Sequence, residues 1–469
     1  MEEIRRLYNI MAIALRKILN RMRERDFERL RYIEPSYENI ILHGLREMFP
    51  QLYDQETRNV AELMERKLRD SPFISKLEVY IEETEDAEAL VFLLRDLDAF
   101  LEDSIYRCRP LGQEIWRFMS LNDNAAACGL YILPRVRCNW EHNNRDAYNT
   151  YTMLYYLRNF YYVDIKNLEE FTVQHILLPQ YMFQNVMKKE ELRICVSPLT
   201  GENVVNVTEP YIWENEKLTA VKPLEPDAEQ KIKAQVLRVL KEAVAQKAEI
   251  LVFPEILGSR EITQMISQEL EERNQTLDNE YPKLTVCPSV WESRRNTCTV
   301  LDAMGEVLFE QQKHHGAGLK LNLDQELWVG KEDIISDNRI YVLHGRGIGR
   351  IAVAICKDFL MTRYLHVLVN VLKVNLLLVP SFSPRDYQFD TLLGKYAAQD
   401  WAVVWANTCS ARWLGEPENM AAAVTRAYFS GKQGRFKEER FLESMCEKQY
   451  TCDGTCLHTY IWQEKEGIG

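Results

Sequence analysis

The 469-residue chain contains little glycine and proline, 19 and 16 residues, a combined share below the average for globular proteins. Collagen-like and linker-dominated structures are therefore excluded. No apolar run approaches the ~18 residues that span a bilayer, and we expect no secretory signal. Because 46% of the residues are hydrophobic and 27% charged, the composition is typical of a globular protein with sizeable cores.

The chain also has fewer basic than acidic residues: 58 Lys and Arg and 70 Asp and Glu give a net charge of −12. An acidic chain is a poor general binder of nucleic acid or anionic membranes. The Arg-rich N-terminus carries too many acidic residues, Glu2 and Glu3 among them, for a transit peptide. Eleven cysteines in a long chain without a signal predict reduced thiols. We therefore expect a cytoplasmic protein that binds neither membranes nor nucleic acid in general.

The hydrophobic pattern changes near residue 190. Before it, helical periodicity predicts helices at 4–22, 55–68, 86–106, 146–162 and 166–188, with Asp86 and Asp146 as N-caps. After it, helices are predicted at 226–248, 358–373 and 388–400. They alternate with predicted strands at 193–198, 249–255, 284–291, 296–302, 306–313, 350–356, 374–381 and 401–408. This alternation predicts a mainly α-helical domain over 1–190 and an α/β layered domain over 191–469.

Three polar residues end predicted strands of the α/β domain, where such folds build their sites: Glu255, Lys313 and Cys356. Each alone is most often structural. Together they form a chemical set, because a thiol at a strand-to-helix turn is favoured as thiolate. A carboxylate can act as its general base, and an ammonium group can stabilise an oxyanion. The set predicts nucleophilic catalysis by a cysteine.

The segments that hold these residues are EILVFPEILGS, NTCTVLDAMGEVLFEQQKHHG, and RIAVAICKDF followed by VNLLLVPSFS. They resemble the nitrilase superfamily of carbon–nitrogen hydrolases over roughly residues 192–430. The resemblance implies an α-β-β-α sandwich. It maps the family's Glu–Lys–Cys triad onto the three residues above and its supporting second glutamate onto Glu326 in DQELWVG. Further matches are Asn296, Asp302 and Gly305 in the family's hairpin, and Asp358 after the cysteine.

The activity implied by the resemblance is hydrolysis of a non-peptide carbon–nitrogen bond in an amide, carbamoyl compound or nitrile, through a cysteine thioester. The resemblance implies neither cofactor nor metal, and it implies a homo-oligomer. The substrate would be bound by Lys357, Ser381 and Phe382. Many family members have an aromatic residue where this chain has Lys357, which suggests a substrate other than the usual small amides.

Other interpretations stay open from the sequence alone. The chain could be a non-catalytic signalling or assembly protein that uses this scaffold for oligomerisation, with a place in a prokaryotic antiviral defence system. The helical domain could gate the site or bind a protein partner. Unliganded cysteines are favoured over a zinc site at Cys446, Cys452, Cys456 and His458, whose spacing is not a standard knuckle. Helix packing is favoured over base stacking for the tyrosine-rich segment 148–162.

Overall fold

The computed structural model describes residues 2–53, 72–102, 104–107, 113–140, 152–274, 282–323, 326–384, 387–393, 401–414, 423–430, 439–445 and 453–463. The chain divides into two compact units. The first comprises Met1–Val136, His142–Glu170 and Gln174–Pro179, and the second Arg137–Glu141, Phe171–Val173 and Gln180–Gly469. The two units therefore interleave along the sequence between residues 137 and 180, whereas the sequence predicts a single boundary at residues 190 and 191.

The first unit is mainly helical, as the sequence predicts. The long amphipathic helix α1 (Glu2–Arg21) buries an apolar face that includes Leu7 and Met11 and packs against α6 (Phe73–Glu83) and α7 (Ala87–Phe100). The predicted cap Asp86 accepts the amide N–H groups of the second and third residues of α7. The other helical segments are α2 (Glu24–Arg31), α3 (Pro35–Met48), η1 (Pro50–Tyr53), α8 (Ser104–Arg107), α9 (Ala125–Cys128), η2 (Met153–Tyr155) and η3 (Ile165–Leu168).

The helices predicted at 146–162 and 166–188 are wrong over much of their length. Strand β3 (Phe160–Asp164) pairs antiparallel with β2 (Leu130–Pro134), and β4 (Thr172–Leu177) pairs antiparallel with β1 (Trp116–Phe118). Among the described residues of this stretch, from 152 on, only α10 (Gln184–Lys189) is an α-helix. Pairing to strands distant in sequence satisfies the backbone and overrides the local helical period. The predicted helix at 55–68 and the predicted cap Asp146 lie outside the described residues.

The sandwich of the second unit is built from two sheets. In one, six strands follow the order β15 (Arg339–Gly345), β16 (Gly349–Val353), β17 (Leu376–Pro380), β18 (Ala402–Ala406), β19 (Ala423–Ser430) and β20 (Glu439–Met445). Of these, β16, β17 and β18 run parallel and are buried at every residue, as their continuous apolar sequences predict.

The other sheet has the order β10 (Val290–Glu292), β11 (Arg295–Asp302), β9 (Leu284–Val286), β8 (Ile250–Val252), β5 (Glu191–Val196) and β21 (His458–Gln463), with β12 (Val307–Gln312) paired to β11. Strand β21 is antiparallel to β5, although the two lie far apart in the sequence. Trp462 on β21 stacks on Trp140 and on Phe429, with ring centroids 4.2 and 5.5 Å away.

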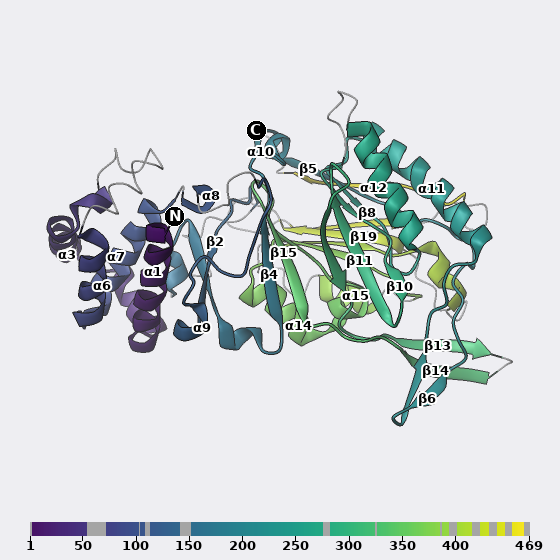
Figure 1. Ribbon diagram of the computed structural model, residues 1–469, viewed down its shortest axis with the longest axis horizontal. Helices are drawn as coiled ribbons and strands as arrows, with labels where there is room; N and C mark the ends of the chain where they lie inside the picture. Colours follow the sequence, from purple (N-terminus) through teal and green to yellow (C-terminus); the bar gives the residue numbers. More distant parts are fainter. Residues whose placement is uncertain are drawn as a thin grey trace. The chain divides into compact units, whose positions relative to one another are not determined.

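Helices cover the outer face of each sheet (Figure 1). Helices α11 (Pro226–Ala245) and α12 (Arg260–Asn274) share one hydrophobic core with β5 and β8. The other sheet carries α13 (Lys357–Leu360), α14 (Thr362–His366), the π-helical segment η4 (Val367–Val371) and α15 (Tyr387–Leu393), and the 3-10 segment η5 (Cys409–Leu414) follows β18. The rings of Phe359 and Phe389 stack at 5.9 Å. This layering confirms the predicted α-β-β-α sandwich.

A third, four-stranded sheet was not predicted. Its order is β13 (Gly318–Leu323), β14 (Glu326–Glu332), β7 (Glu216–Thr219) and β6 (Tyr211–Trp213), and Figure 1 shows it projecting from the sandwich of the second unit. Its role in the site comes from the end of β14, where Glu332 pairs with Thr219 of β7. Among the helices that the structure describes, none is long and apolar enough to cross a membrane.

Candidate active site

The structure brings together Glu255, Lys313 and Cys356, which follow β8, β12 and β16. Glu255 Oε1 accepts a hydrogen bond from Lys313 Nζ at 2.6 Å, and both side chains are 1% exposed. The Cys356 thiol is buried near the Glu255 carboxylate, whose charge helps to raise the pKa of the thiol. Three residues separated by a hundred positions in sequence therefore meet at the ends of their strands, as the sequence predicts.

Cys356 lies on a strained turn between β16 and α13. Its φ of 46° and ψ of −100° fall in a region that non-glycine residues rarely adopt, at a cost of roughly 1–3 kcal/mol. Two hydrogen bonds hold the turn: the Cys356 amide donates to the Pro380 carbonyl at 2.8 Å, and the Phe359 amide donates to the Cys356 carbonyl at 3.1 Å. Such strain persists where the surrounding structure over-determines it, which is common at active sites.

A second buried carboxylate, that of Glu332, shares the lysine. Glu332 Oε2 accepts hydrogen bonds from Lys313 Nζ at 2.5 Å and from the Ala317 amide at 3.1 Å. The side-chain amide of Asn296 donates to Glu255 Oε1 at 2.8 Å and to Glu332 Oε1 at 3.1 Å. Asn296 and Lys313 thus bridge the same two carboxylates and fix their separation.

The resemblance maps the supporting glutamate onto Glu326, but the second carboxylate that binds Lys313 in the structure is that of Glu332. Glu326 begins β14, with its backbone paired to Leu323, and Glu332 ends the strand. Six residues of strand span roughly 20 Å at about 3.3 Å per residue, so Glu326 starts far from Lys313. The position of the strand end distinguishes the two glutamates, and local sequence does not reveal that position.

Burial and charge set the protonation states of this cluster. Burial and the Glu255 charge raise the pKa of the Cys356 thiol far above its ordinary value, against the opposing effect of Lys313. Burial also raises the pKa of Glu255, which Lys313 opposes. Burial alone would lower the pKa of Lys313, but the carboxylates of Glu255 and Glu332 raise it well above its ordinary value. At neutral pH the resting thiol is therefore protonated, beside a carboxylate of increased basicity.

Two of the predicted substrate-binding residues, Ser381 and Phe382, lie directly beside Glu255. The Phe382 amide donates to Glu255 Oε2 at 2.9 Å. The Ser381 carbonyl accepts the Glu255 amide at 3.3 Å, while the Ser381 hydroxyl donates to the Val379 carbonyl at 3.4 Å. The Phe382 backbone therefore orients the Glu255 carboxylate.

The third predicted substrate-binding residue, Lys357, is half-buried at the first position of α13. Its neighbour Asp358 is fully buried. The Asp358 carboxylate accepts the amide N–H groups of His314 and His315, at 3.1 and 2.8 Å, and lies 2.9 Å from His315 Nδ1. These bonds hold the segment after Lys313 against the turn that carries Cys356. Asp358 thus holds the segment that carries Lys313 and the turn that carries Cys356 in position relative to each other.

Among the described residues, no cluster of three or more His, Cys, Asp or Glu side chains is arranged so that it could hold a metal ion. Of the four residues weighed for zinc, Cys446 and Cys452 lie outside the described residues. Cys456 is half-buried and His458 begins β21.

No protein-family model and no curated protein sequence matches the chain, but solved structures do. An amidase from Nesterenkonia sp. AN1 is 16% identical, with 55% of this chain and 95% of that chain covered and a TM-score of 0.34. The C. elegans NitFhit protein is 16% identical, with 54% and 61% covered and a TM-score of 0.35. Saccharomyces cerevisiae Nit3, of branch 10 of the nitrilase superfamily, is 14% identical, with 55% and 91% covered and a TM-score of 0.33. The likeness is one of fold.

Proposed function

We propose that the second unit is a carbon–nitrogen hydrolase that cleaves a non-peptide amide, carbamoyl or nitrile bond with Cys356 as the nucleophile. The observation that carries this proposal is the buried Lys313 ammonium between Glu255 and Glu332, with the Cys356 thiol buried near enough for the Glu255 charge to raise its pKa. Three buried ionisable side chains with two negative charges and one positive charge are costly to fold. Clusters of this kind concentrate at catalytic sites, where they tune proton transfer.

The first half of the reaction forms a thioester when the substrate is an amide. Glu255 accepts the thiol proton, and the Cys356 sulfur attacks the carbonyl carbon. The negative charge that develops on the carbonyl oxygen is stabilised by Lys313 and by the backbone amide of Lys357 at the start of α13. Protonated Glu255 then gives its proton to the leaving nitrogen, the carbon–nitrogen bond breaks, and the acyl group stays on sulfur.

The second half releases the acid. Glu255, again a carboxylate, takes a proton from a water molecule, and the resulting hydroxide attacks the thioester carbon. The carbon–sulfur bond breaks, and the proton held by Glu255 returns to the Cys356 sulfur. A carboxyl with a raised pKa suits both halves, since it must accept a proton from weak acids and return it in each turnover.

Glu332 and Asn296 act as positioning residues in this scheme. Both hold groups that react or stabilise charge, Glu332 through Lys313 Nζ and Asn296 through Glu255 Oε1. A carboxylate on the far side of Lys313 keeps its ammonium protonated and fixed, so that the lysine stabilises charge without donating its proton irreversibly to Glu255.

The experiment that tests the proposal combines turnover with site-specific labelling. Ammonia release is measured over a panel of small amides, carbamoyl compounds and nitriles for the wild type and for Cys356→Ala. In parallel, iodoacetamide labelling is mapped by mass spectrometry in the wild type, Glu255→Gln and Lys313→Met. We expect loss of ammonia release in Cys356→Ala, and labelling of Cys356 that slows in both other variants.

The chain supplies its own internal controls for the labelling. Cys287 and Cys298 are fully buried in the same unit, and burial raises the pKa of both thiols. They should stay unlabelled while the protein is folded. If Cys356→Ala keeps the ammonia release of the wild type, or if Cys356 reacts no faster than these two thiols, the proposal fails.

A further inference from the structure

The small third sheet meets the candidate active site at the end of β14. Glu332 is the last residue of this strand, and Asp333 follows it. Because successive residues of an extended chain direct their side chains to opposite sides, Glu332 contacts Lys313 while the Asp333 carboxylate binds other partners. The Asp333 amide donates to the Thr219 carbonyl at 2.9 Å, which extends the pairing of β14 with β7 by one residue.

The Asp333 carboxylate is buried, with 3% of the side chain exposed, and each of its oxygens accepts a hydrogen bond. Arg294 Nε donates to Oδ1 at 2.9 Å, and Arg294 Nη2 lies 2.8 Å from the same oxygen. The Tyr211 hydroxyl of β6 donates to Oδ2. A buried carboxylate without such partners is costly. Asp333 is therefore attached to two separate elements, strand β6 and the turn that carries Arg294.

Arg294 lies in the two-residue turn that joins β10 to β11, where Glu292 pairs with Arg295. Ser293 and Arg294 have φ values of 51° and 61°, a conformation that favours glycine or asparagine. The backbone of the turn is also held, because the Ile335 amide donates to the Arg294 carbonyl at 2.7 Å. A charged residue in a costly backbone conformation indicates that its side chain has a role at this position.

The same hairpin reaches Glu332 as well. Asn296 of β11, two residues after Arg294, donates to Glu332 Oε1 at 3.1 Å. Arg294 and Asn296 thus bind the adjacent carboxylates of Asp333 and Glu332 from one hairpin. The bond to Asp333 fixes the backbone from which the Glu332 side chain extends. The distance of 2.5 Å from Glu332 Oε2 to Lys313 Nζ therefore depends on that bond.

We propose that Asp333, bound by Arg294 and Tyr211, is a positioning residue that fixes the Glu332 carboxylate beside Lys313. This inference rests on the function proposed above, in which Glu332 holds the lysine ammonium in place. Asp333 acts through the backbone of its neighbour and not on the reacting atoms. Loss of Arg294 leaves the buried Asp333 charge without its cation, so the end of β14 shifts to bring that carboxylate toward water. Glu332 then moves away from Lys313.

The test measures the pH dependence of ammonia release by the full chain with Arg294→Met. The charge of Glu332 raises the pKa of Glu255, so a displaced Glu332 should move the acid limb of kcat/KM to lower pH. Direct loss of the Arg294 charge would instead raise the pKa of a nearby carboxyl group, so the two effects have opposite signs. We expect kcat to fall by up to about 100-fold, which a displacement of ~1 Å can cost, with little change in KM.

Hydrogen exchange tests the position of Glu332 without any turnover. The Ala317 amide donates to Glu332 Oε2 at 3.1 Å, so in Arg294→Met it should exchange about 10-fold faster. The amides of β17 in the sandwich should exchange as in the wild type. If the wild type releases no ammonia, the function proposed above fails, and the exchange of Ala317 alone decides whether Asp333 positions Glu332.

The matched control is Arg260→Met. Arg260 Nε also donates to a carboxylate of the same hairpin, Glu292 Oε2 at 2.6 Å, but this pair is exposed, so its loss should change neither the acid limb nor the exchange of Ala317. Tyr211→Phe removes the other hydrogen bond of Asp333 and keeps the ion pair. It should change both properties in the same direction by less, and it replaces Arg294→Met if thermal melting shows that variant to be unfolded.

A double variant separates positioning from a general loss of stability. Once Glu332→Gln has removed the carboxylate, adding Arg294→Met should not move the acid limb further to lower pH. The proposal is overturned if the folded Arg294→Met variant keeps the wild-type exchange of Ala317, or if its acid limb stays in place or moves to higher pH. It is also overturned if Arg260→Met has the same effects, or if the two substitutions of the double variant shift the limb additively.

Discussion

The Lys313 ammonium and the Glu255 carboxylate are 2.6 Å apart, and each side chain is only 1% exposed. At this depth a charge that loses its partner is far more costly than at the surface. Glu332 Oε2 lies 2.5 Å from the same ammonium. The lysine therefore separates two buried carboxylates. The stability of the second unit and its proposed chemistry therefore depend on the same three side chains.

Lys313→Met should lower the free energy of unfolding by about 3–5 kcal/mol, because two buried carboxylates then face each other without a cation. Urea denaturation measures this change. Adding Glu255→Gln to the variant removes one of the two charges and should recover part of the stability without recovering ammonia release. If Lys313→Met alone were as stable as the wild type, the two carboxylates would have to be neutralised in some other way.

The pH dependence of turnover should have an acid limb set by Glu255. The reaction needs the carboxylate form, so kcat/KM rises as pH rises through the pKa of Glu255, which burial places above its ordinary value. The charge of Glu332 contributes to this increase. Glu332→Gln should therefore lower the pKa of Glu255 and move the acid limb to lower pH, along with a lower rate. A limb that stays in place or moves to higher pH would contradict this assignment.

Gly305→Ala should destabilise the second unit by about 2 kcal/mol or more, because glycine has φ +77° there. An added Cβ would lie 2.2 Å from the Ser267 carbonyl oxygen. Thermal melting and urea denaturation measure the loss. The matched control is Gly44→Ala in α3, where no atom beyond the adjoining residues and backbone of the helix itself lies within 4 Å of the new Cβ and where alanine should stabilise the helix by roughly 0.5–1 kcal/mol. Equal effects of the two substitutions would refute the structural reason.

Asp98 should make the first unit less stable as pH rises from about 4 to 6. Its buried carboxylate accepts the amide N–H groups of Arg158, Asn159 and Phe160, and burial raises its pKa to about 6. In this window the folded carboxyl keeps a proton that the unfolded chain has lost, so folding binds protons and the free energy of unfolding falls as pH rises, by up to about 3 kcal/mol. Above pH 6 the effect levels off.

The comparison variant for this effect is Asp98→Asn, which has no proton to lose at this position. Hydrogen exchange of peptides that cover β3, measured in both proteins at each pH, cancels the intrinsic pH dependence of exchange. The stability of the wild type relative to the variant should decrease between pH 4 and 6. A difference that does not change with pH would indicate that the carboxyl titrates at its ordinary value.

Much of the site could be predicted because its signals are local. Glu255, Lys313 and Cys356 each end an apolar run, and a polar residue in that place is visible without knowledge of the fold. The turn at Asp302 is equally local, since its side chain accepts the amides of Met304 and Glu306 at 2.8 and 2.9 Å. Glu332 could not be predicted in this way, because its approach to Lys313 depends on how the small third sheet meets the sandwich.

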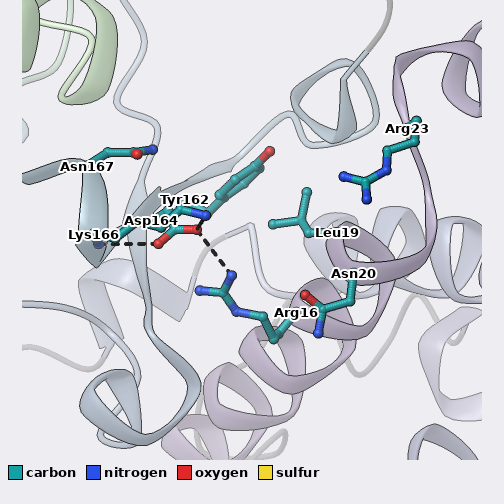
Figure 2. A pocket seen from close by; sticks show the side chains of 8 residues that line it. All are labelled: Arg16, Leu19, Asn20, Arg23, Tyr162, Asp164, Lys166 and Asn167. Atoms are coloured by element: carbon teal, nitrogen blue, oxygen red, sulfur yellow. Dashed lines mark hydrogen bonds and ion pairs between the residues drawn. The ribbon is translucent and has the colours of Figure 1, made fainter.

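The first unit shows where periodicity fails. In β3, Phe160, Tyr161 and Val163 are buried while Tyr162 and Asp164 are half-buried, a mixture that fits a helix as well as a strand. The segment forms a strand because β2, about thirty residues earlier in the sequence, supplies its backbone hydrogen-bond partners. Tyr162 and Asp164 line a cavity of the first unit (Figure 2), so the helical prediction for this segment also misplaces the residues that line that cavity.

The pairing of β5 with β21 also constrains how the protein is made. One edge of β5 is completed only by residues 458–463, and residues 197–457 separate the two strands. During synthesis on a ribosome, that edge of β5 stays without its partner until β21 has left the exit tunnel. An open strand edge invites pairing with other chains, and contacts so distant in sequence form slowly. While the second unit is being synthesised, β5 therefore has an unpaired edge for a long interval, and a chaperone could protect that edge from pairing with other chains.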